Sequence, residues 1–160
     1  THESAIRIIS KTGALNNPAD RDHCLQYMTA IGLLKGNLVA EDYEENVAND
    51  PRVDMLRDLM SVEEDERYSR EYHETDKRSI ANAIQIHFKD GSTTEKVEVE
   101  YPIGHKFRRA EGMPLLQEKF KENLAVRFPA NQVNAVLQMC NDSEAFDNTP
   151  VQDFMDALVI

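Results

Sequence analysis

The sequence of 160 residues has no tryptophan and only two cysteines, Cys24 and Cys140. Two cysteines cannot form a disulfide scaffold, and these two lack the close spacing of a metal site. No run of apolar residues approaches the ~18 residues that a transmembrane helix needs, and no signal peptide opens the chain. These absences argue against a disulfide-stapled protein, a cysteine-held metal centre and a membrane-spanning protein.

Basic residues are also scarce: 18 lysines and arginines stand against 29 acidic residues, a formal net charge of −11. An acidic balance argues against nonspecific binding of nucleic acid. Hydrophobic residues make up 41% of the chain. That share allows about two thirds of the unfolded surface to be buried, and the charged fraction of 29% argues against wholesale disorder. We expect a soluble, intracellular, mixed α/β lobe, and because Thr1 is not a methionine we interpret the chain as a piece of a longer polypeptide.

The first third of the chain predicts one long helix. Residues 3–11 form too short a run for their period to distinguish a helix from a strand, and residues 13–20 are predicted as a loop. A helix is predicted from about Asp20 to Lys35, because apolar residues recur at helical spacing and Gly36 is typical of the position just after a helix. The apolar positions are Leu25, Met28, Ile31 and Leu34.

A second helix is predicted to open at Asp50-Pro51, with the aspartate as cap and the proline in the first turn. Its inner face contains Val53, Leu56 and Met60. Residues 61–78 are the most charged part of the chain, and they predict a solvated surface loop with room for one edge strand.

A β-hairpin is predicted around Asp90-Gly91, a pair that favours a two-residue turn. Apolar and polar residues alternate on both sides of this turn, and pairing Lys89 with Ser92 brings the two apolar faces together. That register sets Phe88 beside Thr93, Ile84 beside Val97 and Asn82 beside Val99, and it leaves Glu95 on the apolar face.

Three helices are predicted in the last third, around Leu116–Leu124, Val133–Cys140 and Val151–Leu158. No alternation of strands and helices occurs, so the fold class is α+β and a Rossmann fold is not expected.

Two clusters of residues could carry chemistry, since the common phosphate-binding, nucleophile-elbow and zinc-protease motifs are absent. The first cluster is Arg21, His23 and Tyr27, a polar stripe on the predicted first helix, where positions four apart share a face. Such a stripe can hold an anion and move a proton. The alternative is a helix N-terminus whose tyrosine only caps the core.

The second cluster is the run Gly104–Arg109, which places His105, Lys106, Arg108 and Arg109 together in an acidic chain. Arginine's planar fork matches carboxylates in two-point contacts, so this loop is a candidate carboxylate clamp. The alternative is a basic surface loop that balances the glutamates near it.

Four segments of the sequence resemble the C-terminal region of the MmgE/PrpD family. They are residues 17–28 (NPADRDHCLQYM), residues 78–83 (RSIANA), residues 100–105 (EYPIGH) and the tail from Pro150 to Ile160. The resemblance extends over all 160 residues and is more specific than any single motif above.

The resemblance implies a hydro-lyase that removes water from 2-methylcitrate to give 2-methyl-cis-aconitate, in propionate catabolism through the methylcitrate cycle. It implies an active site between a large all-helical domain and a smaller α+β lid, with residues 1–112 of this chain as the lid domain and the helices of residues 113–160 packing on the helical domain. It also implies no cofactor, no metal and no iron–sulfur cluster. A small tricarboxylate and the N-terminal helical domain of the same protein are the implied partners. Nucleic acid and membrane are not, a homo-oligomer is left open, and a bacterial-type member implies the cytoplasm.

The resemblance also raises Tyr27 to a catalytic candidate, because a related cis-aconitate decarboxylase has a matching tyrosine in its active site. His23 is the weaker acid–base candidate. Arg21, His105, Arg108 and Arg109 are expected to anchor substrate, on charge grounds. Two alternatives stay open: a family member acting on citrate or cis-aconitate, and a non-catalytic lobe that docks through its apolar terminal helices.

Overall fold

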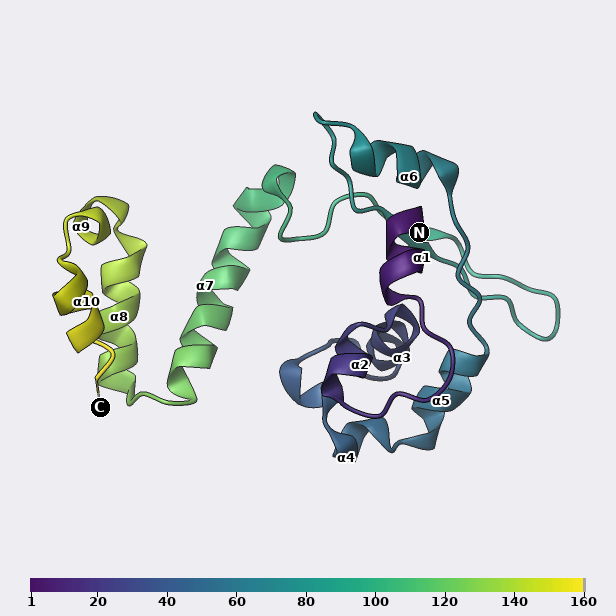
Figure 1. The fold of residues 1–160 in the computed structure, drawn as a ribbon, viewed down its shortest axis with the longest axis horizontal. Coiled ribbons are helices and arrows are strands. Elements are labelled where there is room, and N and C mark those ends of the chain that lie inside the picture. The colour runs from purple at the N-terminus through teal and green to yellow at the C-terminus, as the bar shows by residue number, and fades with distance from the viewer. Residues whose placement is uncertain (160) are drawn as a thin grey trace. The chain divides into compact units, whose positions relative to one another are not determined.

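The computed structural model describes residues 1–159, which form two compact units (Figure 1). The first unit comprises Thr1–Pro102, and the second begins at Ile103. Helices and one small antiparallel sheet make up the described residues, which confirms the predicted α+β class.

The first unit contains six α-helices, one 3₁₀ helix and both strands. These elements are α1 (Glu3–Ile9), α2 (Pro18–Asp22), α3 (Leu25–Lys35), η1 (Ala40–Tyr43), α4 (Glu45–Ala48), α5 (Pro51–Asp58), α6 (Glu66–His73), β1 (Asn82–Ile84) and β2 (Val97–Val99). Several ends lie where their capping residues predict. The Asn17 and Asp50 side chains accept hydrogen bonds at the starts of α2 and α5, and Gly36 ends α3 with a left-handed φ of 78°.

The prediction of one continuous helix from Asp20 to Lys35 is wrong, because the chain breaks at His23 and Cys24. Cys24 has an extended backbone with φ −126° and ψ 106°. Its thiol lies 3.6 Å from the Lys11 carbonyl, and Gln26, just beyond the break, bonds the Ser10 hydroxyl and the Lys11 amide. These contacts with the preceding loop account for the kink that separates α2 from α3.

The core of the first unit lies between α3 and α5. Cys24, Tyr27, Ala30, Ile31 and Val53 are buried together, and Leu56 and Met60, predicted to share a face with Val53, pack against this set. This arrangement confirms the predicted inner face of α5. It also places the α3 tyrosine inside the hydrophobic cluster.

The charged segment 61–78 is a helix over part of its length, where a loop was predicted. Asp65 caps α6 by accepting from the Arg67 amide. Tyr68 and Tyr72, at helical spacing, face inward: Tyr68 donates to Glu98 of β2 at 2.5 Å, and Tyr72 stacks on His2. These two tyrosines form a short amphipathic pattern, which is difficult to recognise in the sequence because charged residues surround it.

The hairpin has the predicted register at its open end and a different one near its turn. β1 pairs with β2 through Asn82↔Val99, Ala83↔Glu98 and Ile84↔Val97. Nearer the turn, His87 instead of Phe88 lies opposite Thr93, and the Phe88 amide bonds the Ser92 carbonyl, so the loop holds three residues. The second strand has one extra residue near Glu95, a β-bulge, which accommodates the one-residue difference between the two registers.

Over residues 103–159, the second unit consists of one 3₁₀ helix and four α-helices. They are η2 (Lys106–Arg108), α7 (Arg109–Ala125), α8 (Ala130–Asn141), α9 (Ser143–Asp147) and α10 (Val151–Asp156). Helix α9 was not predicted. The core of this unit is the buried set Leu124, Val133 and Val136, against which Leu137, Cys140 and Leu158 pack.

Candidate functional site

Arg21 is the innermost cation of the first predicted cluster. It lies near the end of α2 and is only 3% exposed. Its Nη1 donates to the Tyr43 carbonyl at 2.7 Å, and its Nη2 donates to Glu45 Oε1 at 2.6 Å. The guanidinium therefore ties α2 to the η1–α4 segment through one backbone carbonyl and one carboxylate.

Tyr27 is 2% exposed on α3, and its hydroxyl donates to the Asp42 carbonyl at 2.5 Å. Its ring stacks on Tyr43 with ring centres 6.0 Å apart. Burial raises the pKa of the Tyr27 phenol, and the charge of Arg21 opposes part of that rise. Tyr27 is therefore a neutral phenol at physiological pH, suited to donating a proton rather than to accepting one.

Asp42 holds the segment that presents this carbonyl. Its buried carboxylate is paired with the Lys35 ammonium and accepts from the Val39 amide at 2.9 Å. Burial alone raises the pKa of Asp42, but the hydrogen bonds from Lys35 and Val39 outweigh it, so the pKa lies below its usual value. The charged form of Asp42 thus braces η1 beneath Tyr27.

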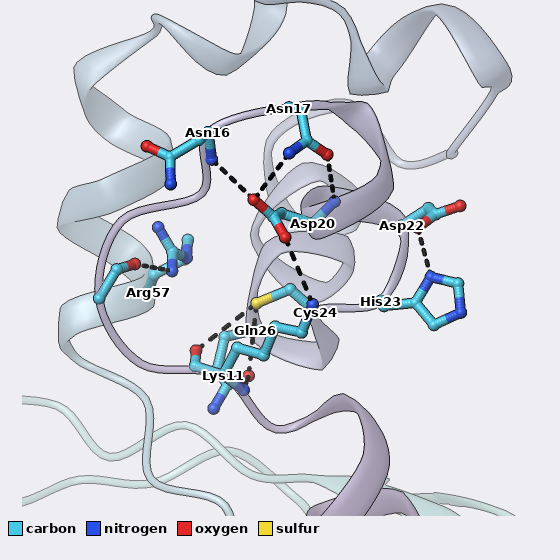
Figure 2. A network of polar contacts seen from close by, with 10 residues as sticks. Lys11, Asn16, Asn17, Asp20, Asp22, His23, Cys24, Gln26 and Arg57 are labelled. Carbon is cyan, nitrogen blue, oxygen red and sulfur yellow. Dashed lines mark hydrogen bonds and ion pairs between the residues drawn. The ribbon is translucent and has the colours of Figure 1, made fainter.

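His23 does not share a helical face with Tyr27, because the chain breaks between them. It is the residue at the end of α2, its side chain is 61% exposed, and its Nδ1 lies 2.5 Å from Asp22 Oδ1 (Figure 2). The adjacent carboxylate orients the imidazole in solvent. The expected polar stripe is therefore divided into a buried pair, Arg21 and Tyr27, and an exposed histidine.

Arg21 and Tyr27 line one pocket of about 310 Å³. Its walls come from the 14–16 loop and from helices α2, α3, α4 and α5, and include Asn16, Glu45, Asn49, Asp54 and Arg57. His23 is not among the lining residues. The pocket thus combines a phenol, two guanidinium groups, two carboxylates and two amides.

Arg57 is a pocket residue that the sequence analysis did not identify. Its side chain is 8% exposed, its Nη1 lies 2.5 Å from Asp54 Oδ1, and its Nη2 donates to the Gly13 carbonyl at 2.7 Å. The available signal was its position four residues after Val53, on the apolar side of α5. An arginine four residues after a buried position on a helix faces the core, so its charge needs hydrogen-bonding partners.

The 13–16 loop that receives Arg57 is held by a network around Asp20. The Asp20 carboxylate accepts from the Asn16 backbone N–H and from the Asn17 side-chain amide, both at 3.1 Å, and the Lys11 ammonium lies 3.8 Å away (Figure 2). Asn17 caps α2 by accepting from the Asp20 amide at 2.9 Å. The loop is therefore fixed by polar contacts with α2, which positions one wall of the pocket.

The second predicted cluster lies in the second unit, around η2. His105 begins η2, its Nδ1 accepting from the Phe107 amide at 3.2 Å. Arg108 binds Glu111 through two nitrogens, at 2.7 and 3.2 Å, so part of the predicted basic loop is neutralised locally. Arg109 lines a separate, mostly apolar pocket of about 300 Å³. Its other walls are Ile103, Gly104, Gly112, Met113, Leu115, Leu116 and Lys119.

Metal-ligand clusters and membrane spans are both absent from residues 1–159. Within this range, no three histidine, cysteine, aspartate or glutamate side chains gather in a way that could hold a metal ion. None of the helices described there combines the length and apolarity needed to cross a membrane.

Comparison with known proteins identifies the family. The model of the MmgE/PrpD C-terminal domain matches residues 1–143. The chain is 52% identical over all its 160 residues to 2-methylcitrate dehydratases of Escherichia coli (strain K12) and Cupriavidus necator, and covers 33% of each. It is 50% identical over 159 residues to the mitochondrial 2-methylcitrate dehydratase of Yarrowia lipolytica, covering 99% of this chain and 30% of that protein.

The chain thus spans about a third of the length of these curated relatives. The resemblance found in the four sequence segments is confirmed, since the family match includes three of them in full. The chain belongs to the MmgE/PrpD family, as its C-terminal domain.

Proposed function

We propose that this chain is the C-terminal third of a hydro-lyase that dehydrates 2-methylcitrate to 2-methyl-cis-aconitate in propionate catabolism. The observation that carries the proposal is 52% identity, over every residue of the chain, to proteins named 2-methylcitrate dehydratase. Identity at about half of the positions along the whole chain supports a shared reaction more strongly than the fold does, because one fold can host many activities.

The proposed reaction breaks one C–H and one C–O bond. A base removes the proton from the carbon beside the hydroxyl-bearing carbon, the electron pair forms the double bond, and the hydroxide leaves as water after an acid protonates it. Cationic groups must also hold the three carboxylates of the substrate. Residues of this chain are candidates for the acid and anchoring roles.

Tyr27 is the proposed acid. Its neutral phenol lines the pocket beside Arg21, and it would exchange the Asp42 carbonyl for the departing hydroxyl group of the substrate. His23 is the second proposed acid–base group, because its imidazole is exposed and oriented by Asp22. The remaining chemistry, including a strong base, is assigned to the part of the enzyme outside this chain.

Arg21, His105, Arg108 and Arg109 are the proposed substrate anchors. Arg21 is the best supported, since it is buried at the pocket and its acidic partner is 62% exposed. Arg108 would exchange Glu111, which is 60% exposed, for a substrate carboxylate. Arg109 lines the pocket of the second unit. No cofactor is assigned to the reaction.

The proposed partner of this chain is a helical N-terminal domain of the same protein. We assign residues 1–112 to the lid and residues 113–160 to helices that pack on that domain. Apolar side chains that are exposed on the hairpin and on α7 support the proposal that another domain covers these elements. They are Ile84, Phe88, Val97, Val99, Leu115 and Leu116. We place the enzyme in the cytoplasm, leave open whether it forms a homo-oligomer, and expect no turnover from this chain alone.

The test is a comparison of substrates with the full-length protein. The rate of alkene formation or consumption is measured on 2-methylcitrate, citrate and cis-aconitate. The expected result is the highest kcat/KM on 2-methylcitrate. A higher value on citrate or cis-aconitate would assign the protein to a different reaction of the same family, and no turnover on any of the three would favour a non-catalytic lobe.

A further inference from the structure

Two buried arginines in the first unit are held in the same way. Arg21 donates to one loop carbonyl, that of Tyr43, and to one carboxylate, that of Glu45. Arg57 likewise donates to the Gly13 carbonyl and pairs with the Asp54 carboxylate. Both guanidinium groups and both carboxylates line the same pocket of about 310 Å³.

The two members of each ion pair differ sharply in exposure. The Arg21 and Arg57 side chains are 4% and 8% exposed, whereas those of Glu45 and Asp54 are 62% and 69% exposed. A buried guanidinium needs a carboxylate partner, because an unpaired charge away from water is costly. An exposed carboxylate needs none, since water solvates it well and a surface ion pair contributes little. A carboxylate from a ligand can therefore take the place of Glu45 or Asp54, whereas each buried arginine must keep a carboxylate partner.

Arg57 also has a donor that its present partners do not use. Its Nε is buried and makes no hydrogen bond to any of the residues described. Buried N–H groups in folded proteins nearly always have a partner, so an unpaired one at a pocket indicates a group that is still to be supplied. The group that fits a guanidinium best is a carboxylate, which accepts from two nitrogens at once.

The remaining lining suits the same kind of ligand. Asn16 and Asn49 contribute amides, Tyr27 contributes a phenol, and the volume lies at the lower end of the range for small-molecule pockets, about 300–1,000 Å³. Polar groups line most of the wall, while Leu15 and two alanines provide the apolar part. A short molecule with several carboxylates matches this composition better than an apolar ligand does.

We propose that Arg57 is a second carboxylate anchor beside Arg21, and that the pocket between them binds one end of a small polycarboxylate by displacing Asp54 and Glu45. The inference rests on the proposed function for the identity of the natural ligand, a tricarboxylate, but not for the binding itself. It assigns to the α5 helix a role in substrate recognition.

The test uses a tricarboxylate that cannot be dehydrated, propane-1,2,3-tricarboxylate, titrated calorimetrically into the full-length protein. Arg57→Gln is expected to raise its Kd at least tenfold, the usual loss when a hydrogen bond to a charged group is removed. Asp54→Asn is expected to lower the Kd about threefold or more, because it removes the competing carboxylate and leaves Arg57 in need of a partner.

Matched controls lie on the same helix. Arg52→Gln removes an arginine that is 65% exposed and is not part of the pocket, and Asp58→Asn makes the same charge change as Asp54→Asn at an exposed site. Both controls are expected to leave the Kd within about twofold of the original. Thermal unfolding of each variant checks that it is folded.

The two substitutions in the pocket decide the inference together. An unchanged Kd in folded Arg57→Gln overturns it, and if that variant does not fold, Asp54→Asn alone decides: a tighter Kd supports the inference and an unchanged or weaker one overturns it. Failure of the original protein to bind the probe at millimolar concentration also overturns it. Binding without turnover of 2-methylcitrate would instead contradict only the proposed function.

Discussion

Tyr27→Phe separates the two roles that the Tyr27 hydroxyl can have. The substitution keeps the ring that packs in the core and stacks on Tyr43, and it removes only the donor to the Asp42 carbonyl. Because the hydrogen bond between Tyr27 and the Asp42 carbonyl is buried, the variant leaves this carbonyl without the donor that Tyr27 supplies. The change therefore affects stability in every case, and it affects rate only if the phenol takes part in the reaction.

The expected magnitudes differ enough to be distinguished. Leaving a buried acceptor unpaired lowers the free energy of unfolding by about 1–3 kcal/mol. Removing an oriented donor from an active site lowers kcat by about 10²–10³-fold, the equivalent of about 3–4 kcal/mol in the barrier. A protein that has lost 1–3 kcal/mol of stability still has nearly all its molecules folded at 25 °C, because domains are stable by about 5–15 kcal/mol.

The assay combines urea denaturation with the kcat for 2-methylcitrate in the full-length protein. We expect both the loss of stability and the fall in kcat. Tyr43→Phe is the control, because it removes a nearby phenol whose pKa is likewise raised by burial but which does not line the pocket. A Tyr27→Phe enzyme that is destabilised by the expected amount but keeps its kcat would refute the catalytic role and leave Tyr27 a structural residue.

Three further outcomes follow from contacts within the two units. Asp42→Asn should lower the unfolding free energy by about 1–3 kcal/mol in urea denaturation, because a buried carboxylate bonded to Lys35 and Val39 loses its charge. Since the pKa of Asp42 is lowered in the folded state, its contribution is complete above the ordinary carboxyl value, about 3.9, and is lost as pH falls through the folded value. Stability of the original protein should therefore fall more steeply below about pH 4 than that of Asp42→Asn, and parallel curves would contradict this. Gly112→Ala should shift α7 and lower the Tm, because a Cβ there would lie 2.5 Å from the Ile103 carbonyl oxygen, whereas Gly32→Ala meets nothing within 4 Å and should not lower it.

The sequence by itself determined the family, the fold class and several element boundaries. Boundaries depend on local chemistry: Asn17 and Asp50 satisfy amides at helix starts, and Gly36 adopts the left-handed backbone that ends α3. The register at the open end of the hairpin followed from alternation, because a shift by one residue would turn every side chain to the other face.

Only the tertiary structure decided which polar residues meet. The break between α2 and α3 arises from contacts of Cys24 and Gln26 with the preceding loop, and it is what separates His23 from Tyr27. Arg57 joins Arg21 at one pocket because α5 packs on α3, which α2 also contacts, and no local pattern encodes that meeting. Local propensity acts over neighbouring residues, whereas the pairing of a buried charge depends on whichever loop the folded chain brings to it.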